Sequence, residues 1–135
     1  MHHDEFIGQV QHAAQLPSRG DAERVTRVVL ETLGERLTEE MAHHLAAQLP
    51  SEIGRHLIGR VASERMTLDQ FHQRIELRER TTATLARRHV DAVLGIVAGA
   101  VSPGVIRHIL NQLPSGFGAV FFATGSKEIG SAAAH

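Results

Sequence analysis

The chain has 135 residues, of which 42% are hydrophobic and 21% charged, and its formal net charge is −1. This length and composition are those of one globular domain that buries its own core without metal ions or disulfides. The absence of cysteine excludes thiol nucleophiles and cysteine-bound zinc or iron–sulfur centres. The N-terminus is acidic, without the apolar segment of a signal peptide, and no apolar stretch is long enough to span a membrane. We therefore expect a soluble, cytoplasmic protein.

Helical periodicity runs through the first half of the chain. A helix is expected over residues 4–14, followed by a turn at 16–20 and a second helix that begins at Asp21 as its N-cap. The outer face of that second helix should be solvated, because it carries Glu23, Arg27, Glu31 and Glu35. Thr38 should cap a third helix that ends at Pro50, and a fourth helix should cover residues 51–61.

The second half shows signals for helix starts and helix ends in the same order. Thr67 and Gln70 form a capping box that opens a helix bearing Phe71 and Ile75. Further helices are expected over 84–100, 103–112 and 115–123, and Ser102 should cap the second of these. Residues 124–135 are rich in glycine, serine and alanine and are expected to be a disordered tail. Because no segment alternates like a strand, the sequence predicts an all-α fold.

The sequence contains an internal repeat. Residues 22–58 align with residues 86–122 at a shift of 64, with ten identical pairs that include Gln48–Ser51 on Gln112–Ser115. Chance would give roughly two or three identities at ordinary composition. We therefore predict a compact bundle of about eight helices built from two tandem four-helix repeats. Both repeats, over about 4–62 and 67–123, would form one domain within residues 1–123.

Several motifs in this order resemble those of the bacterial DUF2267 family. They are the opening DEFIGQV, the run RVVLETLGERL at residues 27–37, the doubled QLPS, and TLDQF at residues 67–71. The resemblance covers about residues 3–122. It implies a compact two-repeat α-helical domain, and it supplies no catalytic residues because the family is described as uncharacterised.

Differences between the two copies indicate where function could lie. On the second helix, four charged residues of the first copy become Asp91, Gly95, Gly99 and Ala100, and a threonine becomes Ile96. Two glycines in a helix interior suggest close approach of another backbone. Either this face is covered within the chain, or Gly95, Ile96, Gly99 and Ala100 form a self-association or partner surface. His89 takes the place of Val25, as a hydrogen-bonded core histidine or a titrating group.

The ten histidines raise the question of a metal site. His44 and His108 are equivalent in the two copies, and together with a carboxylate such as Glu40 they could bind zinc or iron. No His-Glu-x-x-His pattern marks a preformed site. The simpler interpretation is that both histidines make the same structural hydrogen bonds, so no cofactor is expected and zinc or iron is kept as the alternative.

The sequence contains no motif that indicates catalysis or nucleic-acid binding. The chain has no Gly-x-Ser-x-Gly elbow or phosphate loop, and we expect no enzyme activity. Acidic residues interrupt the cluster of basic residues and no aromatic residue lies within it, so nucleic acid is not the expected partner. The cluster consists of Arg74, Arg78, Arg80, Arg87 and Arg88. We expect Arg78 and Arg80 to pair with Glu76 and Glu79 at a solvated helix end.

The sequence therefore predicts a non-enzymatic protein-interaction or adaptor domain, whose partner is either an unknown protein or a second copy of the chain. A homodimer would use the face at residues 95–100. The alternatives kept open are a metal or small-ligand site at the histidines and, more weakly, nucleic-acid or phosphate binding by the second copy. The sequence alone names no partner.

Overall fold

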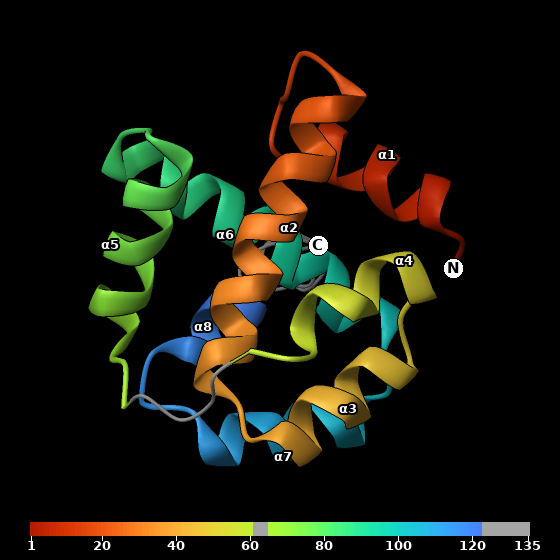
Figure 1. Ribbon diagram of the computed structural model, residues 1–135, viewed down its shortest axis with the longest axis vertical. Helices are drawn as coiled ribbons and strands as arrows, with labels where there is room; N and C mark the ends of the chain where they lie inside the picture. The colour runs from red at the N-terminus through yellow and green to blue at the C-terminus, as the bar shows by residue number, and fades with distance from the viewer. Residues whose placement is uncertain (61–64, 123–135) are drawn as a thin grey trace, which may run out of the picture.

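The structure is a computed structural model that describes residues 1–60 and 65–122 (Figure 1). The described residues form eight α-helices and one 3₁₀ helix and contain no strand, which confirms the all-α prediction. The elements are α1 (His3–Ala13), α2 (Arg19–Arg36), α3 (Glu39–Ala47), α4 (Ser51–Gly54), η1 (Arg55–Leu57), α5 (Leu68–Glu79), α6 (Ala83–Ala100), α7 (Pro103–Gln112) and α8 (Phe117–Phe121). The expected tail at 124–135 lies outside the described residues.

The helix starts follow from side chains that satisfy free backbone N–H groups. Thr67 and Gln70 form the expected capping box at the start of α5. Thr38 accepts from the N–H of Met41 at the start of α3, and Ser102 accepts from the N–H of Val105 at the start of α7. Three of the four caps predicted from the sequence are therefore confirmed.

Several expected boundaries are wrong, among them the start of the last helix, since α8 begins at Phe117 rather than at residue 115. The helix α2 begins at Arg19 rather than after Asp21, because the Ser18 hydroxyl accepts a hydrogen bond from the N–H of Asp21. The Arg19 side chain also reaches the Asp4 carboxylate at 2.8 Å. Residues 19 and 20, expected to end the turn at 16–20, therefore belong to the first turn of the helix. The fourth helix is shorter than expected, since α4 ends at Gly54 and η1 follows.

One hydrophobic core holds the helices together. The two long helices supply most of its centre, with Val29 and Leu33 on α2 and Val93 and Val97 on α6 completely buried. The helix α6 packs against α1, α2, α5 and α8, and α2 packs against α1, α5, α6 and η1. Phe71 of α5 and Phe117 of α8 meet edge to face, with ring centroids 5.1 Å apart. None of the described helices is long and apolar enough to cross a membrane.

The two halves contain elements in the same order. The helices α2 and α6 both have 18 residues, and their first residues are Arg19 and Ala83, which are 64 positions apart. The helices α1 and α5 are each followed, within two residues of their last residue, by a residue with a φ of 55°, Gln15 and Arg80 respectively. These parallels support the interpretation of the chain as a duplication, which stays a prediction.

Candidate functional site

The proposed partner surface lies on the C-terminal half of α6. Gly95, Ile96 and Ala100 are half-buried and Gly99 is exposed. An added Cβ at Gly99 would meet nothing within 4 Å. No charged residue occurs between Asp91 and Arg107, so α6 leads into the start of α7 without a charge. The structure thus places an uncharged, partly open helix face at the predicted positions.

The corresponding face of α2 is covered by the chain itself. Thr32, the counterpart of Ile96, is completely buried. The Arg36 guanidinium donates to the carbonyl oxygen of Met66 at 3.0 Å. Glu35 retains only 18% side-chain exposure, so the expectation that this face is solvated is wrong at this position. The two long helices therefore differ in what lies over equivalent faces.

Two arginines of α5 form ion pairs with the Glu35 carboxylate of α2. The guanidinium of Arg78 donates to both carboxylate oxygens, at 2.5 and 3.0 Å, and Arg74 donates at 3.2 Å. Burial raises the pKa of this carboxyl, but the hydrogen bonds and charges of Arg78 and Arg74 outweigh burial and lower the pKa overall. This cluster fastens α5 to α2.

Most arginines of the cluster thus contact polar or acidic residues of the same chain. Arg78 also donates to Thr32, and Arg87 approaches Asp69 at 3.9 Å. The expected pairing of Arg78 with the acidic residues of its own helix is wrong, because Glu35 on α2 reaches it in a bidentate geometry. Arg88 donates to the Gln15 side chain at 3.5 Å.

The recurrent histidines lie on the outside of α3 and α7. Both His44 and His108 are exposed. Within residues 1–60 and 65–122, no group of three or more His, Asp or Glu side chains is placed to hold a metal ion. The neighbouring glutamines, by contrast, join the two helices. Gln48 accepts from the Ser102 N–H at 2.7 Å, and Gln112 accepts from the Thr38 hydroxyl at 3.4 Å.

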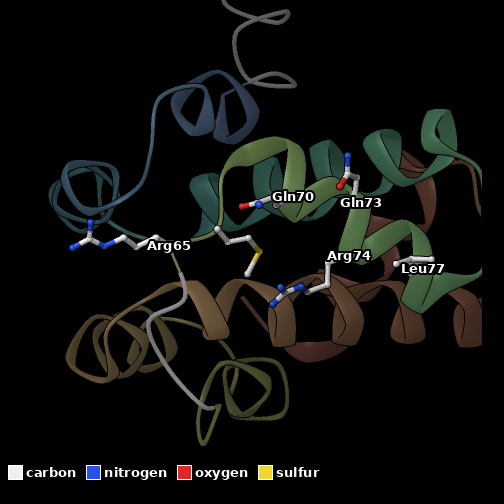
Figure 2. Close-up of a pocket in the computed structure, with 6 residues that line it drawn as sticks. Arg65, Gln70, Gln73, Arg74 and Leu77 are labelled. Atoms are coloured by element: carbon white, nitrogen blue, oxygen red, sulfur yellow. The ribbon is translucent and has the colours of Figure 1, made fainter.

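A shallow groove of about 400 Å³ runs along the outer face of α5 (Figure 2). It is lined by Arg65, Met66, Gln70, Gln73, Arg74 and Leu77. In Figure 2, Arg74 points towards α2, where its partner Glu35 lies, and Leu77 sits at the far end of the groove. Leu77 is 76% exposed, the largest value among the exposed large hydrophobic residues. The groove offers apolar and hydrogen-bonding contacts, and its lining residues include no acid or base that titrates near neutral pH.

Three buried ionisable residues, His72, Glu79 and His89, distinguish the second half. The expectation that Glu79 lies at a solvated helix end is wrong, because Glu79 is only 5% exposed. The Nδ1 atom of His89 lies 2.6 Å from Oε1 of Glu79, and 8% and 2% of these side chains are exposed. His72 is also buried, and neither ring nitrogen has a hydrogen-bond partner among the described residues. Burial lowers the pKa of His72, as does Arg87, whereas Asp69 partly opposes this effect.

A signal for the burial of His72 and Glu79 was present in the sequence. At the shift of 65 that relates the first helices of the two copies, His72 and Glu79 take the places of Ile7 and Ala14. Both counterparts are buried, with 1% and 2% exposure. Glu79 and His89 thus form a polar pair inside the domain, and the second carboxylate oxygen of Glu79, Oε2, has no hydrogen-bond partner among the described residues.

These features define an all-helical domain with one core and several open surfaces. The chain belongs to the DUF2267 family: the family model described as "Uncharacterized conserved protein (DUF2267)" matches residues 3–120. This match confirms the resemblance drawn from the motifs. Comparison with curated proteins gives no match.

Proposed function

We propose that the protein is a non-enzymatic interaction domain that self-associates through the α6 face formed by Gly95, Ile96, Gly99 and Ala100. The observation that carries the proposal is the contrast between equivalent faces of the two long helices. The chain covers the charged face of α2, whereas the uncharged face of α6 leaves Gly99 exposed. An uncharged face that carries two glycines and an alanine lets two copies cross closely around a twofold axis.

The chemistry of this face favours a second copy as its occupant. A self-complementary interface brings each residue near its own counterpart or a neighbour, so like charges at its centre would repel. The stretch from Ala92 to Ile106 contains no charge. Gly99 lies on the exposed side of the helix, and Ile96 adds a half-buried apolar side chain.

The test is the mass in solution of the untagged protein and of two variants, measured by light scattering after size exclusion. We expect the parent protein to be a dimer and Ile96→Glu and Gly99→Glu to be monomers with unchanged helicity. Gly99→Glu is the cleaner variant because its side chain enters open space. Ile96 contacts the core, so Ile96→Glu also loses some stability.

A matched control is Gly8→Glu on α1, since Gly8 is also a helical glycine with nothing within 4 Å of an added Cβ. This variant should remain a dimer. A parent protein that is monomeric at every concentration, or a Gly99→Glu variant that still dimerises, would contradict the proposed surface.

A further inference from the structure

A second groove lies between α1, the N-terminal half of α2 and α4. In Figure 1, α1 and α4 lie on the same side of α2. The groove has a volume of about 310 Å³, and its lining includes the buried side chains of Ile7 and Ile53. Three arginines, two glutamates and two histidines also line it. This combination of an apolar base and a charged rim is typical of sites for small polar ligands.

One residue in this groove has an unmet hydrogen-bonding requirement. Thr26 lines the groove and is 1% exposed, and its Oγ1 atom has no hydrogen-bond partner in the described part of the chain. Thr32, on the same helix, is buried too, but its hydroxyl donates to the Val28 carbonyl oxygen at 2.8 Å. A buried hydroxyl without a partner destabilises a fold, so the Thr26 hydroxyl calls for an explanation.

The lining of the groove is slightly positive, because three arginines outnumber two glutamates, and Arg27 also lies 3.6 Å from Glu31. Arg27 and Arg55 are exposed at its rim, and His56 is half-buried beside them. Burial lowers the pKa of His56, and Arg55, Arg27 and Arg60 lower it further against the opposing effect of Glu31. At neutral pH the ring is therefore uncharged and can donate one hydrogen bond. The same arginines attract an anion to the groove.

We propose that this groove binds a small ligand through an anionic oxygen group, a carboxylate or a phosphate. The anion accepts hydrogen bonds from the Thr26 hydroxyl and the His56 ring and pairs with Arg27 and Arg55, while Ile7 and Ile53 contact the apolar part of the ligand. The site uses none of the α6 residues of the proposed self-association surface, so it goes beyond that function and is tested separately.

The test is an NMR titration of the full chain with sodium acetate and, separately, with inorganic phosphate, each against sodium chloride at equal ionic strength. We expect saturable shifts of the amide signals of Gly20 and His56, which line the groove. Saturation with acetate alone assigns a carboxylate ligand, and saturation with phosphate assigns a phosphate ligand. Shifts that do not saturate with either salt overturn the proposal.

Two variants identify the groups that hold the anion. Thr26→Val should weaken binding by about tenfold or more, the effect of losing a hydrogen bond to a charged group. The same variant should leave the free protein as stable as the parent or more stable, because it removes an unpartnered hydroxyl. Arg55→Gln, at an exposed position, should also weaken binding without affecting folding.

The matched control is Thr32→Val, which removes a hydroxyl that is hydrogen-bonded within the chain. It should destabilise the protein and leave anion affinity unchanged. Equal affinity in the parent protein and in Thr26→Val would overturn the assignment of this hydroxyl to the site.

Discussion

Glu79 and His89 share a buried hydrogen bond of 2.6 Å in the second half of the chain. The positions equivalent to them in the first half, at shifts of 65 and 64, are Ala14 and Val25, which are buried and apolar. The second half thus contains a polar pair where the first has two apolar side chains. Each partner of such a pair depends on the other, because a lone buried polar group costs free energy.

We predict that Glu79→Ala and His89→Val each lower the free energy of unfolding by about 3 kcal/mol. The double variant, which restores the two residues of the first half, should lose much less than the sum of the single losses, because neither polar group is then left alone. Urea unfolding of the parent, the two single variants and the double variant measures this difference.

The control is Glu76→Ala, which removes a less buried carboxylate from the same helix. It should change the free energy of unfolding by no more than about 0.5 kcal/mol. Losses that simply add in the double variant would show that Glu79 and His89 stabilise the fold independently.

Two glutamines connect α3 and α7, and they should contribute unequally. Gln48 accepts from the backbone N–H of Ser102 at 2.7 Å, at the start of α7. Gln112 accepts from the Thr38 hydroxyl at 3.4 Å, which is a weak hydrogen bond. We expect Gln48→Ala to cost about 1 kcal/mol, as for loss of a helix cap, and Gln112→Ala to cost at most about half as much.

Thermal or urea unfolding of these two variants gives the comparison, with Gln73→Ala on the exposed face of α5 as a control that should be neutral. If Gln112→Ala is the more harmful substitution, the hydrogen bond at Ser102 is not what holds α7 against α3.

The stability of the protein should fall below about pH 6.5 through His72. Because burial lowers the pKa of His72 in the folded state, the unfolded chain binds a proton first as the pH falls. Above the unfolded pKa, the ring is neutral in both states and the effect disappears. His56, whose pKa is also lowered, contributes in the same direction.

We predict that His72→Leu raises the free energy of unfolding at pH 7 by about 1 kcal/mol, because it removes two unpartnered ring nitrogens from the interior. It should also reduce the slope of stability against pH between about 6.5 and 5. The measurement is urea unfolding over this pH range. His44→Ala, at an exposed position, serves as the control, and an unchanged slope in His72→Leu would contradict the prediction.

The sequence predicted helix starts better than side-chain partners. Thr67 with Gln70 and Ser102 with its following proline are local signals, because the cap and the group that it satisfies lie within one turn. The start of α2 was misplaced because Gly20 suggests a turn, whereas Ser18 caps the helix and Arg19 binds Asp4 from a neighbouring helix.

The site residues depended on tertiary contacts that no local pattern contains. Nothing near Glu35 in the sequence indicates that Arg78, 43 residues later, would pair with it. Whether Thr26 meets a hydrogen-bond partner likewise depends on what surrounds it after folding. The α6 face could be proposed from the sequence because residues 86–122 align with residues 22–58 and allow a comparison with α2.

Gly34 on α2 is enclosed by neighbouring atoms, whereas Gly99 on α6 has open space beside it. A Cβ at Gly34 would meet the backbone carbonyl oxygen of Leu57 at 2.5 Å, and η1 would have to move. We expect Gly34→Ala to destabilise the protein by about 2 kcal/mol or more, as overpacking does in a core. A Cβ at Gly99 meets nothing, so Gly99→Ala should stabilise the folded monomer by about 0.5 kcal/mol through the higher helix propensity of alanine.

Gly99→Ala also separates the stability of the monomer from association. If α6 crosses a second copy at Gly99, the added methyl group keeps the two backbones apart, so the dimer dissociates at a higher protein concentration while the monomer unfolds at a higher temperature. Sedimentation equilibrium and thermal unfolding at low concentration measure the two effects separately. A Gly99→Ala variant that is more stable and dimerises as tightly as the parent would show that Gly99 lies away from the contact, because only a close crossing makes one methyl group costly.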